Sequence, residues 1–149
     1  MIFTKTLLSL AVMGCLASEP VEPEITTYAG YSEYEIDLMA AVVYLEAGNQ
    51  DMIGKCLVVD AILNRFDSKH FPDTVVAIID QPGQFTTSKR AHELVEQQSI
   101  PYECYGAVLK EICNRSNYEV IYFGRGFECG EPMFKYGDHC FSTISRRLK

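Results

Sequence analysis

The sequence predicts an α+β protein in which helices come first and a small antiparallel β-sheet comes last. Apolar residues recur at helical spacing through residues 33–114. Runs rich in β-branched and aromatic residues are confined to residues 119–123 and 138–143, with glycines interrupting the chain between them. The chain has 149 residues, 48% of them hydrophobic, which is enough to bury one core. We therefore expect a single folded domain.

The first helix is predicted by a capping box, Ser32-Glu33-Tyr34-Glu35, in which Ser32 and Glu35 each bond the other's backbone amide. A left-handed stop is expected at Gly48 or Asn49. The apolar stripe that follows the box consists of Ile36, Met39, Ala40, Val43 and Ala47.

Four further helices are predicted along the chain. The second covers residues 52–66 with Asp51 as its cap, and Asp60 on it is interpreted as solvated. Asp73 is expected to cap a short apolar helix that ends at Asp80. The turn Gln81 to Phe85 and then two more helices follow. These last two helices are expected at residues 89–98 and 101–114.

The N-terminal residues 1–18 have the layout of an export signal, with Lys5 before an apolar run and small residues after it. The apolar run, residues 7–16, is too short to span a bilayer as a permanent helix. We expect it to be cleaved, or to carry a lipid at Cys15, because residues 12–15 loosely resemble a bacterial lipobox. A buried N-terminal helix is the alternative.

Residues 19–31 contain prolines and several acids and are interpreted as a linker, which leaves residues 32–149 as the folded domain. The export signal predicts a periplasmic or cell-wall-associated protein.

The charge and the cysteines exclude several classes of partner and cofactor. A net charge of −7 with scattered basic residues argues against nucleic acid, whose binding requires clustered Lys and Arg. The sequence has no C-x-x-C pair, and a metal site built from Cys129, His139 and Cys140 would have irregular ligand spacing. We therefore expect no metal site and no cofactor. Nothing in the sequence indicates an obligate protein partner.

Glu46 is an acid inside the otherwise apolar stretch VVYLEAGNQ, residues 42–50. On a helix it falls about 70° from the centre of the predicted stripe, on its shoulder. A shoulder position suits a carboxyl that lines a cleft, where partial desolvation favours the protonated form. An ordinary solvated glutamate at the edge of the stripe is the alternative, and helical geometry alone does not separate the two.

The motifs around Glu46 resemble the SleB-type cell wall hydrolase family, the spore-cortex-lytic enzymes and their phage and bacterial relatives. The resemblance covers most of the chain after residue 31, and its strength lies in the order and spacing of the motifs. The matching elements are Val43-Tyr44, Glu46-Ala47, Gly54, Val59, Ile62, Asn64-Arg65, Phe71-Pro72-Asp73-Thr74, Gln84-Phe85, Tyr122-Phe123 and Gly137-Asp138-His139-Cys140-Phe141.

The resemblance implies a lysozyme-like catalytic domain over residues 32–149 that acts on peptidoglycan glycan strands. It implies that Glu46 is the catalytic acid, cleaving between N-acetylmuramic acid and N-acetylglucosamine, with lytic transglycosylase chemistry that releases a 1,6-anhydro sugar. The chain departs from the family pattern at Gly48 to Asp51, where a charged or Gly-rich stretch is usual, and at Asp138, where Asn is common. These departures bear on substrate preference more than on reaction type.

Supporting roles are predicted for four residues. Gln84 lies in a Pro-Gly turn, and its amide can both donate to and accept from an N-acetyl group. Tyr44 and Tyr122 are candidates for the walls of a sugar site, or are core aromatics. His139 is either a cleft residue or a buried core histidine. Asn64-Arg65 is interpreted as structural, bonding neighbouring backbone.

Two other functions are compatible with the sequence. One is a cysteine peptidase acting on peptidoglycan stem peptides, with Cys56 as nucleophile and His139 as base, although Cys56 sits in an apolar helix pattern typical of a buried residue. The other is a non-catalytic cell-wall-binding module in which Glu46 only forms hydrogen bonds.

Overall fold

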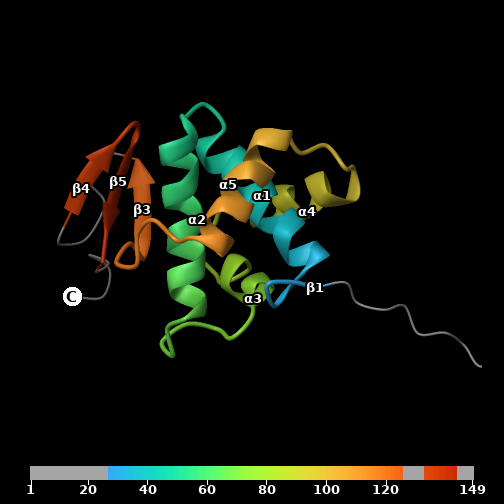
Figure 1. The fold of residues 1–149 in the computed structure, drawn as a ribbon, viewed down its shortest axis with the longest axis horizontal. Helices are drawn as coiled ribbons and strands as arrows, with labels where there is room; N and C mark the ends of the chain where they lie inside the picture. The colour runs from blue at the N-terminus through green and yellow to red at the C-terminus, as the bar shows by residue number, and fades with distance from the viewer. Residues whose placement is uncertain (1–26, 126–132, 144–149) are drawn as a thin grey trace, which may run out of the picture.

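A computed structural model of the chain describes residues 27–125 and 133–143 (Figure 1). Five helices are followed by a small antiparallel sheet, as the sequence predicts; the sheet has three strands where the sequence indicates two, and a two-stranded hairpin precedes the helices. The elements are β1 (Thr27–Tyr28), β2 (Tyr31–Ser32), α1 (Glu33–Ala47), α2 (Met52–Phe66), α3 (Val75–Ile79), α4 (Ser88–Glu96), α5 (Tyr102–Cys113), β3 (Tyr122–Arg125), β4 (Met133–Tyr136) and β5 (His139–Ser142).

The two long helices begin where their caps predict. Ser32 Oγ accepts from the amide of Glu35, and Glu35 Oε2 accepts from the amide of Ser32, so the capping box is confirmed. Asp51 Oδ1 accepts from the amide of Gly54 at the start of α2. The predicted left-handed stop is wrong, because Gly48 has a φ of −57° and α1 ends in right-handed backbone.

The middle of α1 is buried on every side rather than along one stripe. Six consecutive residues, 38–43, are fully inaccessible to solvent. Helices α2, α4 and α5 all pack against α1, so no face of its middle is left to water. A polar side chain is therefore accommodated only near the ends of α1, and Glu46 lies in its last turn.

Asp60 on α2 is fully buried, so its interpretation as a solvated residue is wrong. It lies beside Glu111 of α5, because α2 and α5 pack closely along their lengths. Burial, followed by the neighbouring carboxylate of Glu111, raises the pKa of Asp60 to about 8. Burial opposes ionisation of Glu111 too, but hydrogen bonds, above all that from Lys110, lower its pKa to about 2.

The shorter elements differ from prediction at their ends. Thr74, not Asp73, caps α3, since its hydroxyl accepts from the amide of Ala77. Strand β3 starts at Tyr122, three residues later than the predicted start at 119. Strand β4 was not predicted from the sequence, since its four residues show neither a β-branched side chain nor a clear alternation.

The C-terminal sheet is antiparallel with strand order β3-β5-β4. Phe141 on the central strand pairs with Phe123 on one side and with Phe134 on the other. Its ring lies 6.0 Å and 5.4 Å from theirs between centroids. These cross-strand aromatic pairs fix the register of the sheet.

Helix α2 lies between this sheet and the other helices (Figure 1). Its sheet-facing side contributes Leu57 and Ala61 to a small apolar cluster with Val120 and Phe141. The opposite side of α2 joins the main core with α1, α3, α4 and α5.

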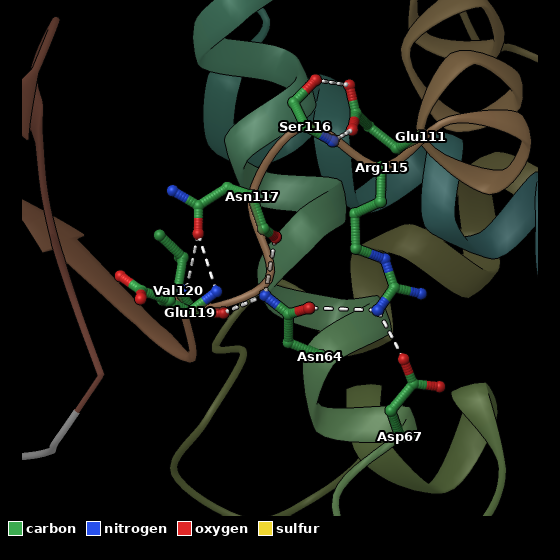
Figure 2. Close-up of polar contacts among 8 residues, drawn as sticks. All are labelled: Asn64, Asp67, Glu111, Arg115, Ser116, Asn117, Glu119 and Val120. Carbon is green, nitrogen blue, oxygen red and sulfur yellow. Dashed lines mark hydrogen bonds and ion pairs between the residues drawn. The ribbon is translucent and has the colours of Figure 1, made fainter.

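The segment between α5 and β3 is tied to α2 by side-chain hydrogen bonds (Figure 2). Asn64 Nδ2 donates to the carbonyls of Asn117 and Val120, at 2.9 and 2.8 Å. Arg115 Nη1 donates to Asn64 Oδ1 and to Asp67 Oδ2. The predicted structural role of Asn64 is confirmed, although its backbone partners are more than fifty residues away in sequence.

The N-terminal predictions fall mostly outside the described residues. The export signal, residues 1–18, and the greater part of the linker lie there, as does Cys129. Residues 27–31, the described end of the linker, form the β1-β2 hairpin together with Ser32. No helix in the described part of the chain is long and apolar enough to cross a membrane.

Candidate active site

The side chain of Glu46 is partly buried and bonds to the loop before α4. Glu46 Oε1 accepts from Thr87 Oγ1 at 2.6 Å. Thr87 is the N-cap residue of α4, a position at which the hydroxyl usually bonds a first-turn amide, yet it makes no such bond here. The helix therefore lacks a side-chain cap, and the hydroxyl is directed at the carboxyl of α1.

His139 on β5 is the second polar group of the site. It is 1% exposed, and its ring packs edge-on against Phe123 and Phe141, with centroids 5.5 and 5.9 Å away. Burial lowers the pKa of His139, while the negative charge of Glu46 partly opposes this. The imidazole is therefore neutral at neutral pH. Among the described residues, none offers a hydrogen bond to its Nδ1.

Arg65 of α2 connects the loop that carries Gln84 to strand β3. Its guanidinium lies 5.4, 5.0 and 5.3 Å from the ring centroids of Phe71, Phe85 and Tyr122. Arg65 Nε donates to the carbonyl of Ile121 at 2.8 Å. Burial lowers the pKa of Arg65 to about 10, so it keeps its charge and favours the electron-rich faces of these rings. Arg65 therefore has the structural, backbone-bonding role that the sequence predicts, although its backbone partner is distant in sequence rather than neighbouring.

Phe85 continues this packing toward the carboxyl. Its ring lies 5.8 Å from that of Phe123, which in turn contacts His139. The rings of Phe85 and Phe123 thus connect Arg65 to His139, whose pKa is affected by the charge of Glu46.

The four predicted supporting residues are placed differently from one another. His139 lies within the electrostatic reach of Glu46. Gln84 is exposed and lies three residues before Thr87 in the same loop. Tyr122 is partly buried against Arg65. Tyr44 is 41% exposed but lies two residues before Glu46, so the two side chains leave α1 in directions about 200° apart.

The two departures from the family pattern contact each other. Asn49 Nδ2 and Gln50 Nε2 both donate to Asp138 Oδ2, at 3.1 and 3.2 Å. Gly137 has a φ of +55°, and a Cβ there would lie only 1.7 Å from Gln50 Oε1. The loop after α1 is therefore held against the turn before His139 by hydrogen bonds. The carboxylate of Asp138 accepts from two side-chain amides.

Asp51 is held at the same end of the fold. Besides capping α2, it accepts from Tyr136 Oη at 2.7 Å through Oδ2. The cap bond and the tyrosine bond lower the pKa of Asp51. The cap predicted from the sequence is confirmed, and both carboxylate oxygens are in use.

Thr87 is the residue that sequence reasoning missed. Its sequence signal is that of a helix cap, a threonine just before the helical stretch, and such a signal predicts a bond to backbone. Only the packing of α4 against α1 brings its hydroxyl to Glu46.

Cys56 lies apart from this site, in the polar cluster between α2 and α5. It is 3% exposed, and Lys110 Nζ is 3.7 Å from its sulfur. Burial, followed by the nearby carboxylate of Glu111, raises the pKa of Cys56 to about 12. The thiol is therefore protonated and a poor nucleophile at neutral pH. In residues 27–125 and 133–143, no group of three His, Cys, Asp or Glu side chains is arranged to hold a metal ion.

The chain is similar to known cell-wall-lytic proteins. The sequence profile of a family described as cell wall hydrolase matches residues 49–142. The spore cortex-lytic enzyme of Halalkalibacterium halodurans is 42% identical over 66 residues, 44% of this chain, and that of Oceanobacillus iheyensis is 44% identical over 64 residues, 43% of this chain. These matches cover 20% and 23% of the two relatives, so the chain corresponds to about a fifth of their length.

Two solved structures share the fold. The catalytic domain of the germination-specific lytic transglycosylase SleB from Bacillus anthracis superposes with a TM-score of 0.65 at 28% identity, covering 78% of this chain and 99% of that domain. The catalytic domain of the Bacillus cereus SleB protein gives 0.64 at 30% identity, covering 76% and 92%. The predicted lysozyme-like arrangement of helices followed by a small sheet is thus the fold of SleB catalytic domains.

Proposed function

Because the chain belongs to the cell wall hydrolase family, we propose that it degrades peptidoglycan as a lytic transglycosylase in which Glu46 is the single acid and base. The bond cleaved is that between N-acetylmuramic acid and N-acetylglucosamine, and the substrate is the glycan strand of the wall. The observation that carries the proposal is the hydrogen bond from Thr87 to Glu46 Oε1 in the last turn of α1, beyond the fully buried middle of that helix.

That hydrogen bond gives the two oxygens of Glu46 different tasks. Oε1 is occupied as an acceptor, which leaves Oε2 to hold a proton and deliver it to the glycosidic oxygen. Protonation makes the leaving group viable, and an oxocarbenium-like transition state follows. The 6-hydroxyl of the muramic acid then attacks its own anomeric carbon, and Glu46 takes up the proton that this hydroxyl releases.

A single acid suffices for this chemistry, whereas a hydrolase needs a second carboxylate to activate water or to attack carbon. Two acids that follow the end of α1 or contact the loop after it, Asp51 and Asp138, are engaged in other hydrogen bonds, which supports the single-acid reaction. Asp51 uses both oxygens, on the amide of Gly54 and the hydroxyl of Tyr136. Asp138 accepts two amide hydrogen bonds through Oδ2. Both are engaged in holding the loop after α1 and the start of α2.

His139 supports the proton donor without competing with it. A neutral, buried imidazole within the electrostatic reach of Glu46 provides a polarisable wall, and it lacks the acidic imidazolium proton at neutral pH. Gln84, exposed on the loop that carries Thr87, is proposed to bind an N-acetyl group, and Tyr122 and Tyr44 are proposed to contact sugar rings.

We further propose that residues 32–149 form the catalytic domain, and that residues 1–18 direct export, by cleavage or by lipid attachment at Cys15, with residues 19–31 as a linker. Action on peptidoglycan requires a location outside the cytoplasmic membrane. Mass spectrometry of the mature protein from cells tests this proposal, because cleavage, lipidation and retention of the segment give three different masses.

Mass spectrometry of the soluble products from purified peptidoglycan tests the reaction itself. Wild-type protein is expected to release fragments with 1,6-anhydromuramic ends, and Glu46→Gln is expected to release none. Fragments with reducing muramic ends would indicate a muramidase instead of a lytic transglycosylase. Free stem peptides would indicate a peptidase or amidase. Folded protein that sediments with the wall and releases nothing would indicate a binding module.

A Cys56→Ser variant separates the glycosidase from the peptidase. Lysis that survives this change and is lost in Glu46→Gln excludes the thiol as nucleophile, as the burial of Cys56 leads us to expect.

A further inference from the structure

The loop that carries Gln84 and Thr87 is closed at its base by one carboxylate. Asp80 ends α3, and Ser88 begins α4, with residues 81–87 between them. Asp80 Oδ1 accepts from Ser88 Oγ at 2.5 Å and from His92 Nε2 at 2.8 Å. Partial burial opposes ionisation of Asp80, but these two bonds hold its pKa below the usual range. The carboxylate therefore stays charged and joins both ends of the loop.

His92 extends this connection to the first turn of α1. Its Nδ1 lies 2.6 Å from Tyr34 Oη, and the two rings stack with centroids 6.0 Å apart. A carboxylate only accepts, so Nε2 carries the hydrogen toward Asp80. In the neutral ring Nδ1 is then an acceptor, and the Tyr34 hydroxyl donates to it. One imidazole thus bridges the end of α3 and the start of α1.

Helix α1 is consequently attached to the α3-α4 segment at both of its ends. Tyr34, in its first turn, bonds His92 of α4, and Glu46, in its last turn, bonds Thr87 just before α4. The second attachment is made by Thr87, which directly precedes α4, and the first is made by His92 within α4. Inside the loop, short-range backbone bonds such as Gln84 N to Gln81 O shape the turn but do not connect it to α1.

The hydrogen bonds connect Tyr34 to His92 and His92 to Asp80, in the same sequence as the nucleophile, base and acid of a catalytic triad. The phenol of Tyr34, however, does not act as a nucleophile. Burial, followed by the charges of Asp80 and Glu96, raises the pKa of Tyr34 above its ordinary value. The hydroxyl therefore stays protonated and serves as a donor.

We propose that Asp80 and His92 are positioning residues that set the register of α4 against α1, so that the Thr87 hydroxyl meets Glu46. This inference rests on the proposed role of Glu46. It assigns to Asp80 and His92 no contact with substrate: they act through Thr87.

A double-mutant cycle between Asp80 and Thr87 tests this. Asp80→Ala is expected to lower kcat on soluble glycan fragments between about tenfold and a hundredfold with little change in KM, because small displacements of a catalytic group have effects of that size. Thr87→Val, which removes only the hydroxyl, is expected to lower kcat about tenfold. The double variant should be no slower than the slower single variant. Reductions that multiply would mean that Asp80 does not act through Thr87.

Two controls exclude a general loss of structure. Asp80→Asn keeps an acceptor oxygen for Ser88 and His92 and is expected to retain kcat within about threefold. Glu93→Ala removes an exposed ion pair with Arg90 on the same helix and is expected to leave kcat unchanged. A loss in Glu93→Ala as large as that in Asp80→Ala would overturn the proposal.

A measurement that does not require turnover separates this inference from the proposed function. The carboxyl carbon of Glu46, observed by NMR in the folded full chain, is expected to shift in the same direction in Asp80→Ala and in Thr87→Val, and to keep its position in Glu93→Ala. A Glu46 signal that moves in Thr87→Val alone overturns the positioning role, even if wild-type protein proves inactive on peptidoglycan. Failure of the proposed function would show instead in the digestion products: an active Glu46→Gln variant, or wild-type protein that releases no anhydromuramic ends.

Discussion

Glu46 and Asp60 are carboxyl groups on neighbouring helices in opposite environments. Glu46 lies in the last turn of α1, partly buried, with one neutral hydroxyl as its hydrogen-bond donor. Asp60 lies in the middle of α2, fully buried beside Glu111, whose own oxygens accept from Lys110 and Ser116. The pKa of Asp60 is raised to about 8, and strongly shifted pKa values of this kind are often sought in active sites.

The difference shows that a strongly perturbed acid is not by itself a catalytic one. Asp60 faces α5 in the interior, where a glycan strand has no access, and its cluster holds helices together. Glu46 combines partial exposure, a donor aimed at one of its oxygens and a neutral histidine nearby. Solvent access and hydrogen-bond geometry make Glu46 the catalytic candidate. Burial and charge pairing indicate a structural role for Asp60 and Glu111.

The largest expected effect is on catalysis at Glu46. Glu46→Gln keeps the shape of the side chain and removes the proton donor, so the rate of glycan cleavage should fall about 10²- to 10⁴-fold. Asp60→Asn, the same change in the buried cluster, should leave the rate within about twofold of wild type. Release of soluble fragments from labelled peptidoglycan measures both. Equal losses in the two variants would mean that the buried acid contributes to catalysis as much as Glu46 does.

For stability we expect the opposite: a change in the buried cluster of Asp60 and Glu111 should have the larger effect. Glu111→Ala leaves Lys110 and the amide of Ser116 without their carboxylate partner and should lower the free energy of unfolding by about 3 kcal/mol. The exposed pair of Arg90 and Glu93 provides a matched control, since Glu93→Ala should cost less than about 0.5 kcal/mol. Urea unfolding followed by circular dichroism gives both values. A small effect at Glu111 would mean that the cluster is not a structural tie.

The pH dependence of stability should report on Asp60. Its pKa is higher in the folded chain than in the unfolded chain, so its stabilising contribution is complete below the unfolded value and is lost as the pH rises toward about 8. Asp60→Asn does not titrate. The difference in unfolding free energy between wild type and this variant should therefore change by on the order of 2 kcal/mol between about pH 5 and about pH 8. Parallel pH profiles would contradict the raised pKa.

Glu111 should affect the stability of the fold at low pH. Its pKa is lowered to about 2, so the stability that it contributes is present above the unfolded value and is lost as the pH falls toward about 2. The Glu111→Ala variant should lose this acid-dependent component, and acid titration of the two proteins compares them directly.

The smallest effect is expected at Gln84, in the loop before α4. Gln84 is exposed, so Gln84→Ala should leave the unfolding free energy within about 0.5 kcal/mol of wild type. If its amide binds an N-acetyl group, KM should rise by about threefold to tenfold, the value of one hydrogen bond, with kcat nearly unchanged. Steady-state kinetics on soluble fragments test this, and an unchanged KM would remove Gln84 from the binding site.

Local signals were sufficient for much of the fold. The capping box of α1 and the Asp51 cap of α2 are properties of a few adjacent residues, and both helices begin where those residues predict. The burial of Asp60 was not predictable in the same way. Periodicity places it on α2, but the partner that surrounds it comes from α5, about fifty residues later.

The same limit applies to the candidate site. The residues around Glu46 make it the predicted catalytic acid, since its neighbours in sequence are part of the pattern that the chain resembles. Thr87 and the connection from Asp80 through His92 to Tyr34 depend on how α4 packs against α1, and no short sequence pattern encodes that contact. Strand β4 was missed because its pairing with β5, rather than its own residues, makes it a strand.

The origin of the oxygen at the cleaved muramic acid tests the single-acid account most directly. Digestion of purified peptidoglycan in heavy-oxygen water, followed by mass spectrometry, reports whether solvent enters the product. If Glu46 alone performs the acid and base steps, the muramic ends are anhydro sugars that carry no solvent oxygen. Muramic ends labelled by solvent would contradict the account, because activation of water requires a second carboxylate that the proposed reaction does not use.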